Sequence, residues 1–134
     1  MTGFPLKIVT PDGIRFDGTA QRVVVRTTSG DVAIMARHIN YVAPLGMGQA
    51  SVTVDGEVRR GACIGGMISV VDGQVTLVPT TFEWSQDIDV ARAEKSEQRA
   101  NKILKDKDAS KTELSLAEAR LKRALVRKSV ANFK

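Results

Sequence analysis

Asp87, Asp89 and Arg92 stand close together where the sequence changes from strand-like to helix-like. Carboxylates accept hydrogen bonds from amino and hydroxyl groups, and the fork of an arginine guanidinium suits the oxygens of a phosphate. These side chains therefore have the chemistry of half a nucleotide site. The alternative is a plain helix start, in which an aspartate caps the helix and Asp89 pairs with Arg92 at i,i+3 spacing.

More positive charge follows in the last third of the chain, where it can meet these residues. Four further arginines carry it: Arg99, Arg120, Arg123 and Arg127. With a turn near residue 108, two antiparallel helices would set Arg92 level with residues 123–127. Guanidinium groups gathered in this way repel one another unless an anion neutralises them. Glu83 and Asp89 could then accept hydrogen bonds from an adenine amino group or a ribose hydroxyl. On these residues alone, the nucleotide site and the plain helix start both remain open.

The elements that must position these residues change in period near residue 84. Before it, short β-type runs are cut by glycine turns, and none of the eleven glycines lies beyond Gly73. Asp55-Gly56 and Asp72-Gly73 predict two-residue hairpins, because both positions of a type I′ turn need positive φ. Eight or more short strands at this spacing predict a small sandwich or barrel over residues 1–84.

Residues 85–134 instead predict two helices, at about 88–105 and 111–131. Asp87 is the expected N-cap of the first, with Asp89 in its first turn. Ser110 and Glu113 have the spacing of a capping box for the second. The short linker between them predicts an antiparallel hairpin. Its apolar positions are mostly alanines with few leucines, so we expect the two helices to be held weakly. The apolar positions are Ala93, Ala100, Ile103, Leu104, Leu114, Ala117, Leu121, Ala124 and Leu125.

Composition excludes several classes of function. One cysteine (Cys63) and one histidine (His38) exclude an internal disulfide and make a zinc site of the usual ligands untenable, and no catalytic motif is present. Aromatic residues, at 4%, are too few for stacking single-stranded nucleic acid. The opening residues lack a signal-peptide pattern, so we expect a cytoplasmic protein. Residues 87–134 contain thirteen Lys/Arg against eight Asp/Glu, which predicts an acidic partner for this segment.

Four stretches, in this order along the chain, resemble the epsilon subunit of bacterial F-type (proton-translocating) ATP synthases. They are LKIVTPDGIRFDG, TTSGDVAIMARHINYVAPL, IGGMISVVDGQVTLV and IDVARA. The last fits the family's Ile/Leu-Asp-x-x-Arg-Ala motif. Departures are Ala33 in place of glycine, Ala36 and Asn40 in place of prolines, and Met67 in place of phenylalanine. The loss of two prolines predicts a less constrained backbone in the 35–41 loop.

The resemblance implies a fold and a role. The fold is an N-terminal flattened antiparallel β-sandwich followed by a C-terminal antiparallel two-helix hairpin. The role is that of a non-catalytic rotor subunit, whose sandwich binds the gamma subunit and the c ring during proton-driven ATP synthesis. The hairpin either folds against the sandwich or extends toward the alpha/beta catalytic head and slows ATP hydrolysis. The protein would then be peripheral, on the cytoplasmic face of the bacterial membrane, held there only through the complex.

The resemblance also implies binding residues. An ATP site on the folded hairpin would use eight positions: Glu83, Ile88, Asp89, Arg92, Ala93, Arg99, Arg123 and Arg127. ATP would be a regulatory ligand, with no cofactor or metal required. Arg37 and His38 would contact the c ring. In the extended hairpin, the basic residues facing the beta subunit would be Arg120, Lys122, Arg123, Arg127 and Lys128. The alternative function is a free-standing ATP-binding sensor outside any large complex, and nucleic acid is a poorer partner because no such motif is present.

Overall fold

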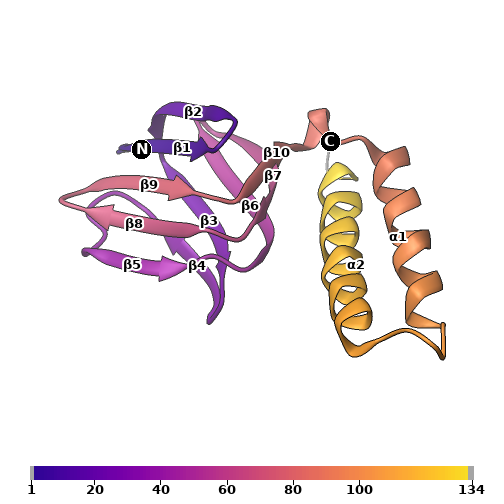
Figure 1. The fold of residues 1–134 in the computed structure, drawn as a ribbon. Helices are drawn as coiled ribbons and strands as arrows, with labels where there is room; N and C mark the ends of the chain where they lie inside the picture. Colours follow the sequence, from indigo (N-terminus) through magenta and orange to yellow (C-terminus); the bar gives the residue numbers. More distant parts are fainter. Residues whose placement is uncertain (1, 133–134) are drawn as a thin grey trace. The chain divides into compact units, whose positions relative to one another are not determined.

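The computed structural model describes residues 2–132, and the chain divides between Trp84 and Ser85 into two compact units. The first unit is a β-sandwich of two five-stranded sheets, and the second contains two antiparallel helices (Figure 1). The predicted fold class, a β-sandwich followed by a helical hairpin, is confirmed. Neither helix has the length and apolar character needed to span a bilayer, within residues 2–132.

The two sheets are built from strands that are distant in sequence. The first sheet has the order β2 (Gly13–Ala20), β1 (Phe4–Thr10), β9 (Gln74–Val78), β8 (Met67–Val71), β5 (Tyr41–Pro44). The second has the order β10 (Thr81–Trp84), β7 (Glu57–Ile64), β6 (Met47–Val54), β3 (Arg22–Thr27), β4 (Gly30–Ile34). Neighbouring strands are antiparallel, except that β1 and β9 run parallel. This one parallel pair joins the beginning of the sandwich to its end.

Both predicted Asp-Gly hairpins are present. Asp55 and Asp72 have a φ of 50°, and Gly56 and Gly73 follow with φ of 83° and 80°. These turns connect β6 to β7 and β8 to β9. Positive φ at both central positions is the requirement of a type I′ turn, which matches the twist of the flanking strands.

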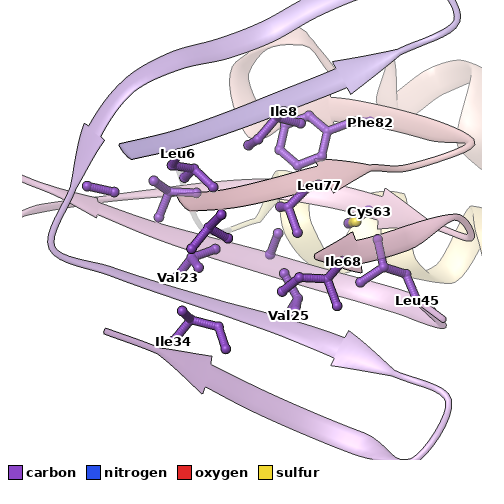
Figure 2. Packing of buried hydrophobic residues seen from close by; sticks show 14 of the residues in the cluster. Leu6, Ile8, Val23, Val25, Ile34, Leu45, Cys63, Ile68, Leu77 and Phe82 are labelled. Carbon is purple, nitrogen blue, oxygen red and sulfur yellow. The ribbon is translucent and has the colours of Figure 1, made fainter. Parts of the chain in front are cut away.

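The core lies between the two sheets, where inward-facing side chains of both meet (Figure 2). Strand β1 shows the alternation: Phe4, Leu6 and Ile8 are buried, whereas Pro5 and Lys7 are exposed. Figure 2 shows Leu6 and Ile8 packing with other residues of the core, among them Val23, Val25, Ile34, Leu45, Cys63, Ile68, Leu77 and Phe82. Burial of aliphatic side chains at about 1.5–3 kcal/mol each is the main stabilisation of the sandwich.

Helix α1 spans Val90–Leu104 and helix α2 spans Lys111–Ala131, after a short 3-10 helix η1 at Ser85–Asp87. The predicted capping box of α2 is confirmed, because the Ser110 hydroxyl and the Glu113 carboxylate each accept from the other's backbone N–H. The expected alanine seam is present too. Only its alanines are fully buried, namely Ala93, Ala100, Ala117 and Ala124. Leu125, which we placed in the apolar stripe, is 46% exposed.

Candidate functional site

The start of the hairpin differs from its prediction by two residues. The N-cap of α1 is Asp89, whose carboxylate accepts a hydrogen bond from the backbone N–H of Arg92 at 3.0 Å. Asp87, the predicted cap, instead ends η1. The reason is that Ser85 and Ile88 are buried and the Ile88 N–H bonds to the Ser85 carbonyl at 3.4 Å, which continues the 3-10 turn past Asp87. The helix therefore begins later.

This geometry decides part of the question raised by the sequence. Asp89 is a cap, and one of its carboxylate oxygens is engaged by the backbone. The i,i+3 ion pair with Arg92 is not formed, since no ion pair joins these two side chains in the described part of the chain. Both residues are exposed. The carboxylate edge and the guanidinium are thus open to solvent at the positive end of the helix, where anionic groups are favoured.

The structure places seven of the eight predicted ATP-binding residues on the hairpin unit and Glu83 on β10 of the sandwich. Ile88 and Ala93 are buried, so they shape the beginning of the hairpin and do not present side chains to solvent. Arg92 and Arg99 are exposed on α1. Arg123 and Arg127 are half-buried on α2, one turn apart on the same face.

The register of the two helices also differs from its prediction. The Lys128 ammonium lies 2.7 Å from a Glu97 carboxylate oxygen and 3.7 Å from one of Glu94. Because the helices are antiparallel, Arg92, which precedes Glu94, lies level with the chain beyond Lys128. The sequence had placed it level with residues 123–127. The prediction assumed a symmetrical hairpin, whereas α2 has 21 residues and α1 has 15.

The basic residues assigned to the extended hairpin fall into two environments. Arg120 and Lys122 are exposed on α2. Lys128 is engaged with Glu94 and Glu97, and these contacts raise the pKa of its ammonium, the hydrogen bond to Glu97 most of all. Lys128 is therefore already paired with carboxylates of its own chain in this conformation, a contact that depends on helix register and has no local sequence signal.

The predicted c-ring residues lie in the loop between β4 and β5. Arg37 is exposed in a left-handed conformation with a φ of 67°. The His38 ring nitrogen Nδ1 lies 2.8 Å from the Ile39 carbonyl, and its ring meets Tyr41 edge to face at 5.9 Å. Asn40, in place of a family proline, accepts a hydrogen bond from the Asp72 N–H at 2.9 Å. This bond restrains the loop end that the sequence led us to expect to be less constrained.

Two apolar surfaces of the sandwich were missed by the sequence analysis. In the same loop, Met35 and Ile39 are 54% and 78% exposed. On the outer face of the first sheet, Met67 lies between Pro44 and Val78 in cross-strand register, with Val42 nearby on β5. Exposed apolar side chains grouped in this way are typical of protein contacts. The signal in the sequence was only partial, since the outward positions of β8 and β9 include apolar Met67, Val71 and Val78 but also polar Ser69, Gln74 and Thr76.

Within residues 2–132 no group of three or more histidine, cysteine or acidic residues is placed to hold a metal ion. Cys63 is buried in the core, and this burial raises the pKa of its thiol to about 12. A buried neutral thiol is inert as a nucleophile and as a ligand.

Comparisons with known proteins agree on one family. Residues 3–85 match the family described as "ATP synthase, Delta/Epsilon chain, beta-sandwich domain", and residues 86–132 match its "long alpha-helix domain". The chain is 44% identical over 135 residues to the ATP synthase epsilon chain of Ruminococcus albus, with 100% of both chains covered. It is 35% identical to that of Caldanaerobacter subterraneus subsp. tengcongensis, over 96% of this chain and 94% of the relative.

Solved structures show the same fold at low identity. A chain in the mitochondrial ATP synthase of Euglena gracilis superposes with a TM-score of 0.84 at 19% identity, covering 100% of this chain and 83% of that one. A chain in the central stalk and c ring of the Tetrahymena thermophila mitochondrial ATP synthase superposes with a TM-score of 0.65 at 14% identity, covering 95% of each.

Proposed function

This chain belongs to the ATP synthase delta/epsilon family and is an epsilon subunit of an F-type ATP synthase, and on that premise we propose that it couples gamma to the c ring and regulates ATP hydrolysis through its hairpin. The Tetrahymena relative in fold belongs to a structure described as central stalk and c ring. In this role the protein is not itself catalytic. It would be peripheral at the cytoplasmic face of the membrane, held there through the complex.

The coupling role is supported by the apolar surfaces of the sandwich. Burial of Val42, Met67 and Val78 against a partner would remove exposed apolar area from water, which stabilises a stalk contact. The loop with Arg37 and His38 fits a second contact, to the c ring. Copurification with gamma separates this function from a free-standing ATP sensor. A sensor outside the complex would leave gamma in the flow-through, whereas a stalk subunit would retain it.

For the hairpin we propose that ATP is a regulatory ligand of the folded form. The observation that carries this is the solvent-open Asp89 and Arg92 at the N-terminus of α1, on the same hairpin as Arg123 and Arg127. Guanidinium groups and a helix N-terminus both suit phosphate oxygens. Asp89 offers an acceptor for an adenine amino or ribose hydroxyl group.

Regulation then follows from linkage. A ligand that binds only the folded hairpin stabilises it by RT ln(1 + [ATP]/Kd), about 2.7 kcal/mol at one hundred times Kd. That is enough to retract a hairpin held by a seam of alanines. When ATP falls, the hairpin would extend and present Arg120, Lys122 and Arg123 to an acidic segment of the beta subunit. Hydrolysis would therefore be slowed at low ATP and released at high ATP.

Calorimetric titration of the full chain with ATP tests the ligand. We expect saturable binding that is weakened at least tenfold by Arg92→Gln or Arg123→Gln, because each removes a guanidinium that can donate two parallel hydrogen bonds to phosphate oxygens. The matched control is Arg120→Gln, which removes the same charge from an exposed position of α2 outside the proposed site. Equal weakening by the control would indicate a general charge effect. No heat at millimolar ATP would refute the site.

A further inference from the structure

Lys128, in the last turn of α2, bridges two carboxylates of α1. Its ammonium is 2.7 Å from Glu97 and 3.7 Å from Glu94. Side-chain exposure is 30% for Lys128, 23% for Glu97 and 57% for Glu94. The closer pair is thus the better shielded one. It joins residues 31 positions apart in sequence, so it exists only while the two helices lie together.

The arrangement makes the two helices depend on this lysine. Glu94 and Glu97 are three residues apart on one helix, and like charges at that spacing repel each other. Lys128 neutralises this repulsion from the other helix. It also stands where the C-terminal end of α2 favours a cation. Apart from Val130, the fully buried residues of α1 and α2 are alanines, which bury little area and hold the helices weakly. A cross-helix charge contact therefore carries more weight here than it would in a leucine-rich hairpin.

We infer that Lys128 is a latch, holding the hairpin closed through Glu97 and Glu94 and exchanging these carboxylates for an acidic partner when the hairpin opens. The first half concerns the folded protein alone. The second half rests on the proposed function, in which Lys128 belongs to the basic surface of the extended hairpin. The two uses exclude each other, because an ammonium in contact with Glu97 cannot meet a partner's carboxylate without leaving it. Opening the latch and creating the binding surface would be the same event.

Hydrogen exchange of α2 amides in the full-length chain measures the latch directly. In Lys128→Met the aliphatic stem is kept and the charge is lost. We therefore expect the population of open hairpin to increase about 1.4- to fivefold, the range for a partly exposed ion pair. Lys122→Met is the matched control, since Lys122 is an exposed lysine of the same helix. We expect it to leave exchange unchanged.

A charge exchange tests whether the contact itself is responsible. Lys128→Glu adds a third carboxylate beside Glu94 and Glu97 and should loosen the hairpin further than Lys128→Met. Combining it with Glu97→Lys restores an opposite pair and should recover most of the protection. If Lys128→Glu lowers the protection of the α2 amides and the double variant does not restore it, the latch is refuted. It is also refuted if Lys122→Met loosens the hairpin as much as Lys128→Met does.

ATPase assays of the assembled complex separate this inference from the proposed function. If Lys128→Met loosens the hairpin and alters inhibition of hydrolysis, both stand. If hydrogen exchange is faster but inhibition of hydrolysis is unchanged, the latch stands, and the transfer of Lys128 to carboxylates of an acidic partner is refuted. If exchange is unchanged, the latch is refuted whatever the ATPase rate shows.

Discussion

Asp89→Ala and Asp87→Ala form a pair of substitutions that tests where the hairpin begins. The structure makes Asp89 the cap of α1 through its bond to the Arg92 N–H at 3.0 Å, and it places Asp87 in the preceding 3-10 turn. Replacing an aspartate cap with alanine costs about 1 kcal/mol, within a range of 0.5–2. Asp87→Ala removes no capping bond, so we expect a small effect. A sequence-based assignment would predict the opposite order.

A loss of this stabilisation is large for a hairpin held by a seam of alanines. About 1 kcal/mol corresponds to roughly a fivefold change in the population of open hairpin. Asp89→Asn separates two contributions, because asparagine keeps the capping oxygen at about the same rank as aspartate but removes the charge. The remaining loss is the interaction of that charge with the helix N-terminus, about 0.3–1 kcal/mol. We therefore expect the order of stability wild type, then Asp89→Asn, then Asp89→Ala.

Amide exchange of the first turns of α1, followed by NMR, is the assay. Faster exchange in Asp89→Ala and near-wild-type exchange in Asp87→Ala would support the assigned cap. Equal exchange in the two variants would refute this reasoning. Adding ATP extends the test: if the hairpin is mostly closed, a fivefold rise in a small open population scarcely changes the apparent Kd. A loss of ATP affinity of tenfold or more in Asp89→Asn would therefore come from direct contact.

Two further predictions concern the sandwich. Gly66→Ala should lower the free energy of unfolding more than Gly73→Ala does, as measured by urea unfolding through the fluorescence of Trp84, the single tryptophan. Both glycines have positive φ, which costs an alanine about 1–3 kcal/mol at either position, but only at Gly66 would the new Cβ overlap the Val78 carbonyl oxygen. Equal costs would refute the close approach. Cys63 should resist alkylation at pH 8 in the folded protein and react in urea, because a pKa of about 12 leaves about one thiolate in 10⁴. The contribution of the Cys63 thiol to stability should be present below its ordinary pKa of 9.0 and be lost as pH rises toward about 12. Rapid alkylation without denaturant would contradict its burial.

Local signals predicted local structure. The Asp-Gly turns and the Ser110–Glu113 capping box depend on residues within four positions of one another, so the sequence specifies them directly. The cap of α1 was missed because the burial of Ser85 and Ile88, a tertiary effect, extends the 3-10 turn past Asp87. Propensity ranks both aspartates as caps and cannot choose between them.

Contacts between residues distant in the sequence had no local sequence signal that could predict them. The parallel pairing of β1 with β9 joins residues about 70 positions apart, and the order of strands in each sheet depends on the whole sandwich. The Lys128–Glu97 contact depends on helix register, which the assumption of a symmetrical hairpin placed wrongly. Charge repeats at i,i+3 and i,i+4 identified which residues share a helix face, yet they did not identify which face meets the other helix.

The composition of the seam explains why small effects can control the hairpin. A buried alanine methyl contributes about as much as one methylene, ~0.8 kcal/mol, against about 1.5–3 kcal/mol for a fully buried leucine. Four alanines of the seam, Ala93, Ala100, Ala117 and Ala124, thus contribute about as much as one or two leucines would, and Val130 is the one larger side chain that α1 and α2 bury fully. Leu116, meanwhile, remains 53% exposed. A hairpin built this way has a closed state that a cap, one latch lysine or a ligand can each shift by a similar amount. Deeper packing of leucines would have made it rigid and insensitive to all three.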